Sequence, residues 1–146
     1  MSEASMRSHL VKKLASLDAV SIESPTTGKG VPDVNTTCGW IECKWLRSWP
    51  KNCEISPVKF LHPLSVEQQI WLWRRWKCGG NSWVMAKVSS EWFMWEGHIF
   101  KESGLWDNMT RPQMIERSVL YFKNGLESET LINYMLEKRR LSSEDV

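Results

Sequence analysis

Asp33, Glu42 and Lys44 are the side chains in this sequence whose types and spacing best fit a chemical reaction. Side chains alternate between the two faces of a β-strand, so a strand over residues 40–45 directs Glu42 and Lys44 to the same face. A second strand over residues 31–34 brings Asp33 beside Glu42 if the two strands pair. Two converging carboxylates repel each other unless a cation lies between them, and Mg²⁺ or Mn²⁺ suits such oxygen ligands.

A divalent ion at this point can polarise a phosphate ester and lower the pKa of a bound water. Lys44 can then position or deprotonate that water, or offset negative charge in the transition state. The alternative interpretation is a solvated acid–lysine pair on an exposed strand edge, which is worth at most about 1 kcal/mol. The three residues taken alone favour this alternative, because such a short pattern also occurs by chance.

The hydrophobic pattern predicts the elements that would position these residues. Gln68 can close a capping box with Ser65 at the start of the clearest helix, and Gly79 with Gly80 ends it. We expect helices over residues 2–17, 65–77, 110–124 and 128–140. We expect strands over residues 19–23, 31–34, 40–45, 82–88 and 92–95, and a long loop over residues 47–63. This order predicts an α/β domain with a mixed central β-sheet flanked by helices.

Composition limits the possible classes of protein. The 146 residues fit one domain, and the apolar runs are too short to span a bilayer. The N-terminus lacks the apolar stretch of a signal peptide, so we expect a cytoplasmic protein with no membrane partner. The four cysteines form no CxxC pair, which favours reduced, mostly buried thiols over a zinc site.

Positive charge is concentrated in the middle of the chain. Residues 44–87 carry eight basic and two acidic residues, a net charge of +6, whereas the whole chain has +2. This segment is either a phosphate-binding face or a solvated surface with scattered basic residues. The candidate DNA contacts are Arg47, Lys51, Arg74, Arg75 and Lys77. At helical spacing, we expect the tryptophans of residues 71–76 to pack in the core instead of stacking on bases.

Several motifs together resemble the PD-(D/E)XK nuclease superfamily. The signature is Pro32-Asp33 followed by Glu42-Cys43-Lys44. The sequence is more similar to the VRR-NUC and phage Holliday-junction-resolvase branch. That similarity rests on a glycine at position 30, a Leu-Ser-x-x-Gln-x-x-Trp-Leu helix over residues 64–72 with Gln68, and the Gly79-Gly80 pair before the next strand. The resemblance covers roughly residues 19–96.

The resemblance implies a restriction-endonuclease-like core and specific roles for its residues. Asp33 and Glu42 would bind Mg²⁺, for which Mn²⁺ can substitute, together with the backbone carbonyl of Cys43 and with Glu23. Lys44 would be the catalytic lysine. Gln68 would complete the site, but a capping role competes with this, and we expect it to perform only one of the two well.

Other residues can be given either a structural or a catalytic role. Glu23 is either a further ligand or a charge at a strand end. Glu3 is the only acid before Asp18, but the helix dipole is a sufficient reason for an acid in a first turn. His62 and His98 are candidate bases that the mechanism does not require.

The resemblance implies a metal-dependent DNA endonuclease, selective for Holliday junctions or branched DNA and acting as a homodimer. Its similarity to phage members indicates a viral source, and hence the host cytoplasm. Residues 1–100 would form the nuclease core. Residues 101–146 would be a helical extension that belongs to the same domain or forms the dimer interface. There are two alternatives. One is a catalytically inactive nuclease-fold protein that binds DNA or acts as an inhibitor, and the other is a sequence-specific restriction-type nuclease.

Overall fold

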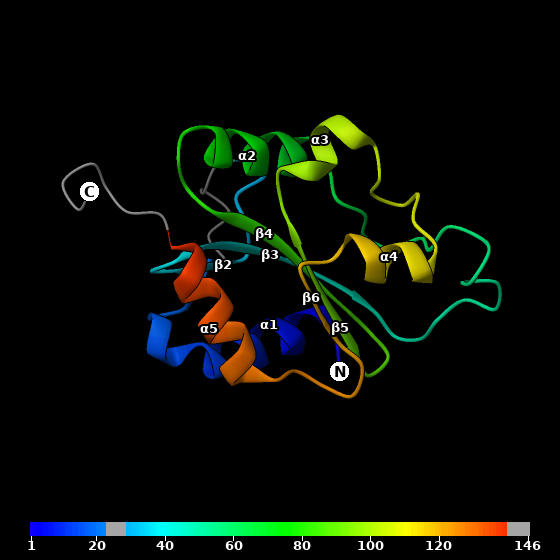
Figure 1. The fold of residues 1–146 in the computed structure, drawn as a ribbon, viewed down its shortest axis with the longest axis horizontal. Helices are drawn as coiled ribbons and strands as arrows, with labels where there is room; N and C mark the ends of the chain where they lie inside the picture. Colours follow the sequence, from blue (N-terminus) through cyan, green and yellow to red (C-terminus); the bar gives the residue numbers. More distant parts are fainter. Residues whose placement is uncertain (23–28, 140–146) are drawn as a thin grey trace.

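A mixed six-stranded sheet forms the centre of the computed structural model, which describes residues 1–22 and 29–139 (Figure 1). The strands lie in the order of the sequence, and only β3 and β4 pair in parallel among the described strands. They are β1 (Val20–Ser21), β2 (Val34–Thr36), β3 (Gly39–Leu46), β4 (Ser82–Val88), β5 (Glu91–Glu96) and β6 (Leu120–Phe122). The predicted α/β class with a mixed sheet is confirmed.

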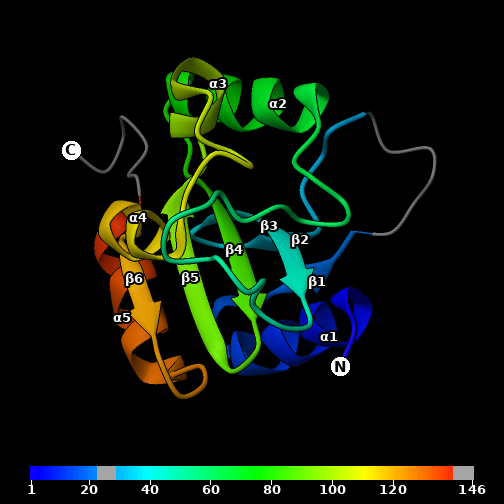
Figure 2. The ribbon, with the colours of Figure 1, turned by 90° about the vertical axis from the view of Figure 1, so that its right-hand side faces the viewer.

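Helices cover both faces of this sheet (Figures 1 and 2). The helices are α1 (Glu3–Lys13), α2 (Val66–Lys77), α3 (Ile99–Ser103), α4 (Arg111–Arg117) and α5 (Ser128–Lys138), with a short 3₁₀ turn at Ala15–Leu17. One core cluster joins α1 and α5 to the sheet through side chains such as Leu10 and Met135. The other joins α2, α3 and α4 to the opposite face through Leu72, Phe100 and Met114.

Strand β3 sends chemically different side chains to these two layers. Ile41 and Cys43 are fully buried in the α1 and α5 layer. Glu42 and Lys44 alternate with them and therefore face the α2 layer, although they are also almost fully buried. Helices on both faces explain why β3 lies in the interior. Two ionisable side chains in such a layer need a specific reason to be there.

Helix α2 is the crossover between the parallel strands β3 and β4, and its two ends follow the predicted signals. The hydroxyl of Ser65 accepts a hydrogen bond from the Gln68 N–H, and the Gln68 side chain accepts one from the Ser65 N–H, which forms a complete capping box. Gly79 lies just beyond the helix with φ +100°, a conformation that suits glycine. Local sequence signals at both ends of α2 therefore fix where this helix begins and ends.

The C-terminal part differs from the sequence prediction. The capping box of Thr110 and Gln113 is present, but α4 ends at Arg117 and not near residue 124. The apolar residues 120–122 form strand β6 along the free edge of β5, so sheet pairing overrides a helical pattern. Helix α3 was not predicted, and α5 starts at Ser128 with Glu127 at its N-cap, where no side chain caps the helix.

Two further expectations concern the chain as a whole. Cys38, Cys43 and Cys53 are buried free thiols, as predicted, and Cys78 is exposed. In residues 1–22 and 29–139, no helix is both long and apolar enough to cross a membrane.

Candidate active site

Asp33 and Glu42 meet because β2 and β3 form an antiparallel hairpin. Val34 pairs with Ile41, so Asp33, directly before β2, lies opposite Glu42. Asp33 precedes the strand, which begins at Val34 and not at the predicted residue 31. Its Oδ2 accepts a 2.9 Å hydrogen bond from the backbone N–H of Cys43. This bond holds the Asp33 carboxylate against β3, next to the face that carries Glu42.

The Glu42 carboxyl group lacks the partners that a buried carboxylate requires. Its Oε1 is buried and has no hydrogen-bond partner among the described residues. Burial, followed by the nearby charge of Asp33, raises the pKa of Glu42 to about 8, although Lys44 opposes this shift. Ionised Glu42 is therefore unstable in this environment unless additional positive charge is supplied.

Lys44 supplies part of that charge. Its Nζ lies 3.3 Å from Glu42 Oε2, and both side chains are almost completely buried. The same ammonium group donates to Gln68 Oε1 at 3.2 Å and to the Pro63 carbonyl at 3.5 Å. One amine is thus held in place by three oxygen atoms from β3, α2 and the preceding loop.

Gln68 closes the capping box and also contacts Glu42 and Lys44, so the two sets of contacts do not compete as we expected; its role in a reaction stays a prediction. Its Oε1 accepts from the Ser65 N–H at 2.9 Å, as the capping box requires. Its Nε2 donates to Glu42 Oε2 at 2.9 Å, while Oε1 also accepts from Lys44. A primary amide has two donor hydrogens and an acceptor oxygen with two lone pairs, so these contacts are compatible.

Gly30 explains how the segment before Asp33 approaches α2 so closely. Its φ is +82°, and a Cβ atom at this position would lie 2.4 Å from the backbone oxygen of Glu67. Any side chain there would separate this segment from the first turn of α2. Gly30 therefore positions Asp33 and Gln68 relative to each other.

The first helix adds two residues to the site. Burial raises the pKa of Glu3, Lys44 lowers it and Asp33 raises it, so Glu3 lies within electrostatic reach of both groups. Arg7 Nη1 lies 3.6 Å from Asp33 Oδ1. Glu3 was a candidate from the sequence, whereas Arg7 was not. Arg7 could have been found from the sequence, because Glu3 and Arg7 are four residues apart and therefore lie on one face of the predicted helix.

The donor set fits a hard divalent cation. Asp33 and Glu42 provide carboxylate oxygens, and Glu42 Oε1 is a buried acceptor without a hydrogen bond. Within the described ranges, no three His, Cys, Asp or Glu side chains are arranged to hold a metal ion. Mg²⁺ commonly binds to one or two carboxylates and keeps several waters, so two carboxylates are a sufficient set.

The remaining predicted ligands and bases are placed differently. Glu23 lies outside the described residues. Cys43 contributes its N–H to Asp33, and the role of its carbonyl stays a prediction. His62 is exposed and close enough to lower the pKa of Glu3. His98 stacks on Trp76 with ring centroids 3.8 Å apart, roughly 12 Å along α2 from Gln68.

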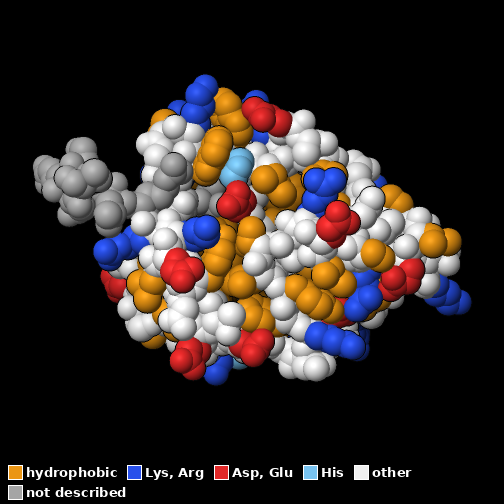
Figure 3. All heavy atoms as spheres, viewed as in Figure 1, with side chains coloured by type: hydrophobic (Ala, Val, Ile, Leu, Met, Phe, Trp, Pro, Cys, Tyr) orange, Lys and Arg blue, Asp and Glu red, His pale blue; other side chains and the backbone are white. Residues whose placement is uncertain are grey.

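The basic residues predicted to contact DNA are all exposed, but they do not form one stripe. Arg47 and Lys51 follow β3, whereas Arg74, Arg75 and Lys77 lie in the last turns of α2. Arg75 and Lys77 stack on different tryptophans on different sides of that helix. On the face shown in Figure 3, basic and acidic side chains are interspersed. Their contact with DNA stays a prediction.

The expectation that the α2 tryptophans pack in the core holds only in part: Trp71 packs against the core cluster of the α2 layer, whereas Trp76 is exposed. Leu72 is the buried residue of α2, whereas Trp71 and Trp73 are only partly buried and Trp76 is 39% exposed. Leu72, with the partly buried Trp71 packed against the same core cluster, docks the helix on the sheet. The large rings instead lie around the helix, where cationic side chains cover them.

In the comparisons with known proteins, no family model matches this chain, and no curated protein matches its sequence.

Proposed function

We propose that this chain is a metal-dependent endonuclease that hydrolyses phosphodiester bonds in DNA. The observation that carries the proposal is the buried Oε1 of Glu42, which has no hydrogen-bond partner among the described residues and lies beside Asp33 and within the reach of Lys44. A structural ion pair would have its oxygens satisfied, whereas a ligand site keeps one available. The motif resemblance described above independently implies the same chemistry.

In this mechanism, Asp33 and Glu42 would hold Mg²⁺. When bound, the ion supplies polarisation of the phosphate and a lower pKa for a coordinated water. Its charge also favours the ionised form of Glu42, whose pKa is otherwise raised to about 8. Binding of Mg²⁺ and loss of the proton from Glu42 would therefore favour each other.

Lys44 and Gln68 act on the reacting groups through their fixed positions. The Lys44 ammonium group exchanges its long 3.5 Å contact with the Pro63 carbonyl for a phosphate oxygen and stabilises the negative charge that develops during attack. Gln68 contacts both Glu42 and Lys44, so it keeps the carboxylate and the amine at a constant separation. The capping box fixes Gln68 in turn, which ties the geometry of the site to the start of α2.

Branched DNA, such as a Holliday junction, is the substrate that we propose, and a homodimer is the acting form. The resemblance to junction resolvases supports the substrate. Resolution requires two coordinated cuts, which two copies of one site can make. Sedimentation of the protein with and without a junction measures this assembly, and a monomer bound to the junction would contradict it.

The direct test is cleavage of a labelled four-way junction in Mg²⁺, beside a linear duplex of the same arms. Wild type should cut the junction, and Asp33→Ala should not. Glu129→Ala, which removes an exposed acid of α5, is the control and should cut normally. A wild-type protein that binds the junction but leaves it intact with several metals would exclude the enzyme and favour a binding protein. Cleavage of the linear duplex at fixed sites would favour a restriction-type nuclease.

A further inference from the structure

An aromatic and cationic groove runs along α2, away from the candidate active site. Gln68, Trp71 and Arg75 are spaced by three and four residues and therefore lie on one side of the helix. On the facing strand, Trp40 lies two residues before Glu42 and points to the same layer. The rings of Trp40 and Trp71 meet edge to face, with centroids 5.2 Å apart.

Arg75 completes this cluster. Its guanidinium carbon lies 4.5 Å from the centroid of Trp71 and 5.7 Å from that of Trp40. A basic residue in the last turn of a helix can be explained by the helix dipole alone. The dipole, however, does not explain why the planar guanidinium group stacks over two tryptophan rings at the surface.

The cluster borders two adjoining cavities of about 270 Å³ and 230 Å³. Trp71 and Arg74 line the first, Trp40 and Arg139 line the second, and Arg75 lines both. Among the described residues that line them, three are arginines and none is acidic. The groove can therefore accept a planar ring and negative charge together.

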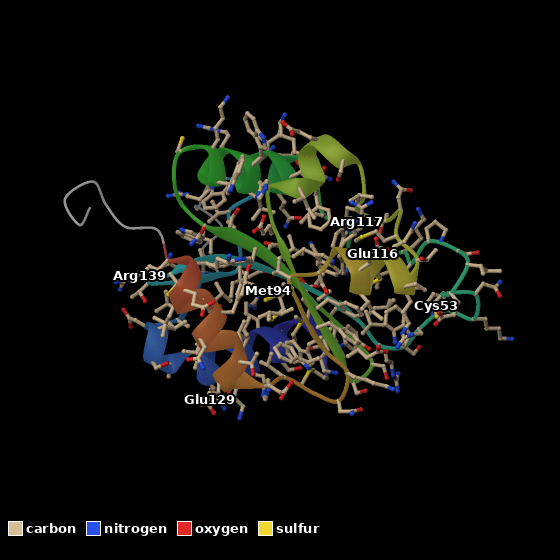
Figure 4. The ribbon with its side chains drawn as sticks, viewed as in Figure 1. Cys53, Met94, Glu116, Arg117, Glu129 and Arg139 are labelled. Carbon is tan, nitrogen blue, oxygen red and sulfur yellow. The ribbon has the colours of Figure 1, made fainter. Side chains whose placement is uncertain are left out.

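The end of α5 forms the outer edge of the groove. The Asn81 side chain donates to the Lys138 carbonyl and, at 3.3 Å, to the Cys38 carbonyl. These bonds tie the end of the helix to the β2–β3 turn, beside Arg139. Figure 4 shows Arg139 at the end of α5, on the opposite side of the molecule from Cys53 and the loop after β3.

The groove is also at a suitable distance from the candidate active site. Trp40 is separated from Glu42 by two residues of β3, about 7 Å along the strand. This separation is of the order of the distance between neighbouring nucleotides of an extended single strand. A DNA strand with its phosphate at Asp33 and Glu42 can thus reach Trp40 and Trp71 with its next nucleotides.

Resting on the proposed function, we propose that this groove binds a single-stranded segment of the DNA substrate beside the scissile phosphate. An unpaired base stacks on Trp71 and the Arg75 guanidinium group, and neighbouring phosphates contact Arg74 and Arg139. The faces of paired bases are covered inside a duplex, so only an unpaired base can use these rings. The substrate then carries unpaired nucleotides at its branch point.

The test is fluorescence anisotropy with a short labelled oligothymidine in EDTA, so that binding is measured without cleavage. Trp71→Leu should weaken binding about 10-fold or more. Trp73→Leu is the matched control, since Trp73 is also partly buried on α2 and has a lysine over its ring, but lies outside the groove. It should change the affinity less than about twofold. A duplex of equal length should bind more weakly and not respond to Trp71→Leu.

A second measurement separates phosphate contact from stacking. Arg74→Gln, which removes a proposed phosphate contact, should lower the slope of log affinity against log salt by about 0.7, whereas Arg117→Gln on α4 should leave the slope unchanged. If Trp71→Leu and Trp73→Leu had equal effects, or if neither had an effect, the proposal that the groove binds DNA would be contradicted. Tighter binding of an equally long oligouridine would overturn the assignment to DNA.

The outcomes also separate this inference from the proposed function. Normal DNA binding and junction cleavage by Trp71→Leu would contradict the proposal that the groove binds DNA and would still support the proposed nuclease activity. If DNA binding depends on Trp71 but the wild-type protein cuts no DNA, the proposed nuclease activity is contradicted and DNA binding by the groove is supported.

Discussion

Glu42 and Glu91 are two buried glutamates of the same sheet that have opposite surroundings. Glu42 is 2% exposed and Glu91 is 8% exposed, so both are hidden from solvent, although Glu42 lies deeper in the protein. Burial by itself raises the pKa of Glu91, but hydrogen bonds from Arg111, Tyr121 and Trp49 more than offset it, and the net pKa is lowered. The pKa of Glu42 is raised to about 8 because burial and Asp33 outweigh Lys44.

The difference teaches how a structural acid and a candidate ligand can be told apart. Glu91 has its carboxylate oxygens occupied by Arg111 and Tyr121, which joins β5, α4 and β6. Glu42 has one oxygen held by Lys44 and Gln68 and the other without a partner in the described chain. A satisfied carboxylate stabilises the fold, whereas an unsatisfied one is available to a ligand.

The largest effect that we expect is on cleavage. Glu42→Gln should lower junction cleavage about a thousandfold, because a neutral amide neither attracts the cation nor balances Lys44. The measurement is the single-turnover rate in Mg²⁺. Glu91→Gln should cut at nearly the wild-type rate under conditions in which it is folded. If both variants lost activity equally, the distinction between the two glutamates would be lost.

The next effect is on stability, and it is expected at Glu91. Glu91→Gln should lower the free energy of unfolding by about 3 kcal/mol at pH 7, because Arg111 loses its buried partner. Urea denaturation measures this change, with Glu116→Gln on the exposed side of α4 as the control. Below pH 4.5 the difference should shrink, since Glu91 loses its charge as the pH falls through its lowered pKa.

The two glutamates should also give opposite pH dependence. Between pH 4.5 and 8, folded Glu42 keeps a proton that the unfolded chain releases, so stability in EDTA should fall as the pH rises. The slope contributed by one proton is at most about 1.4 kcal/mol per pH unit. Thermal unfolding at several pH values measures it. The slope should disappear in Glu42→Gln and decrease in wild type with saturating Mg²⁺; an unchanged slope in that variant would contradict the raised pKa.

The smallest effect compares two capping boxes. Gln68 and Gln113 each close a box at the start of a helix, but only Gln68 also contacts Glu42 and Lys44. Each Gln→Ala variant should lose about 1 kcal/mol of stability. Only Gln68→Ala should also lower cleavage, about 10- to 100-fold. Equal activity of the two variants would reduce Gln68 to a capping residue.

Local signals predicted the part of the fold that lies around the candidate site. The capping box at Ser65 and the glycine after α2 fix both ends of that helix, because these are backbone requirements of a few neighbouring residues. The alternation in β3 likewise predicted that Glu42 and Lys44 would share a face. Strand β6 was not predicted, because its three residues form a strand only when the edge of β5 is available for pairing.

The sequence by itself determined which groups meet, since the hairpin register of β2 and β3 brings Asp33 opposite Glu42. Only the tertiary structure decided their electrostatic state, because burial and the positions of Lys44, Gln68 and Glu3 depend on packing between distant elements. It also decided that Trp71 and Trp73 are only partly buried and that Trp76 is exposed. Periodicity in the sequence shows which side of a helix is apolar. How much of that side is buried depends on how far the neighbouring elements extend over it.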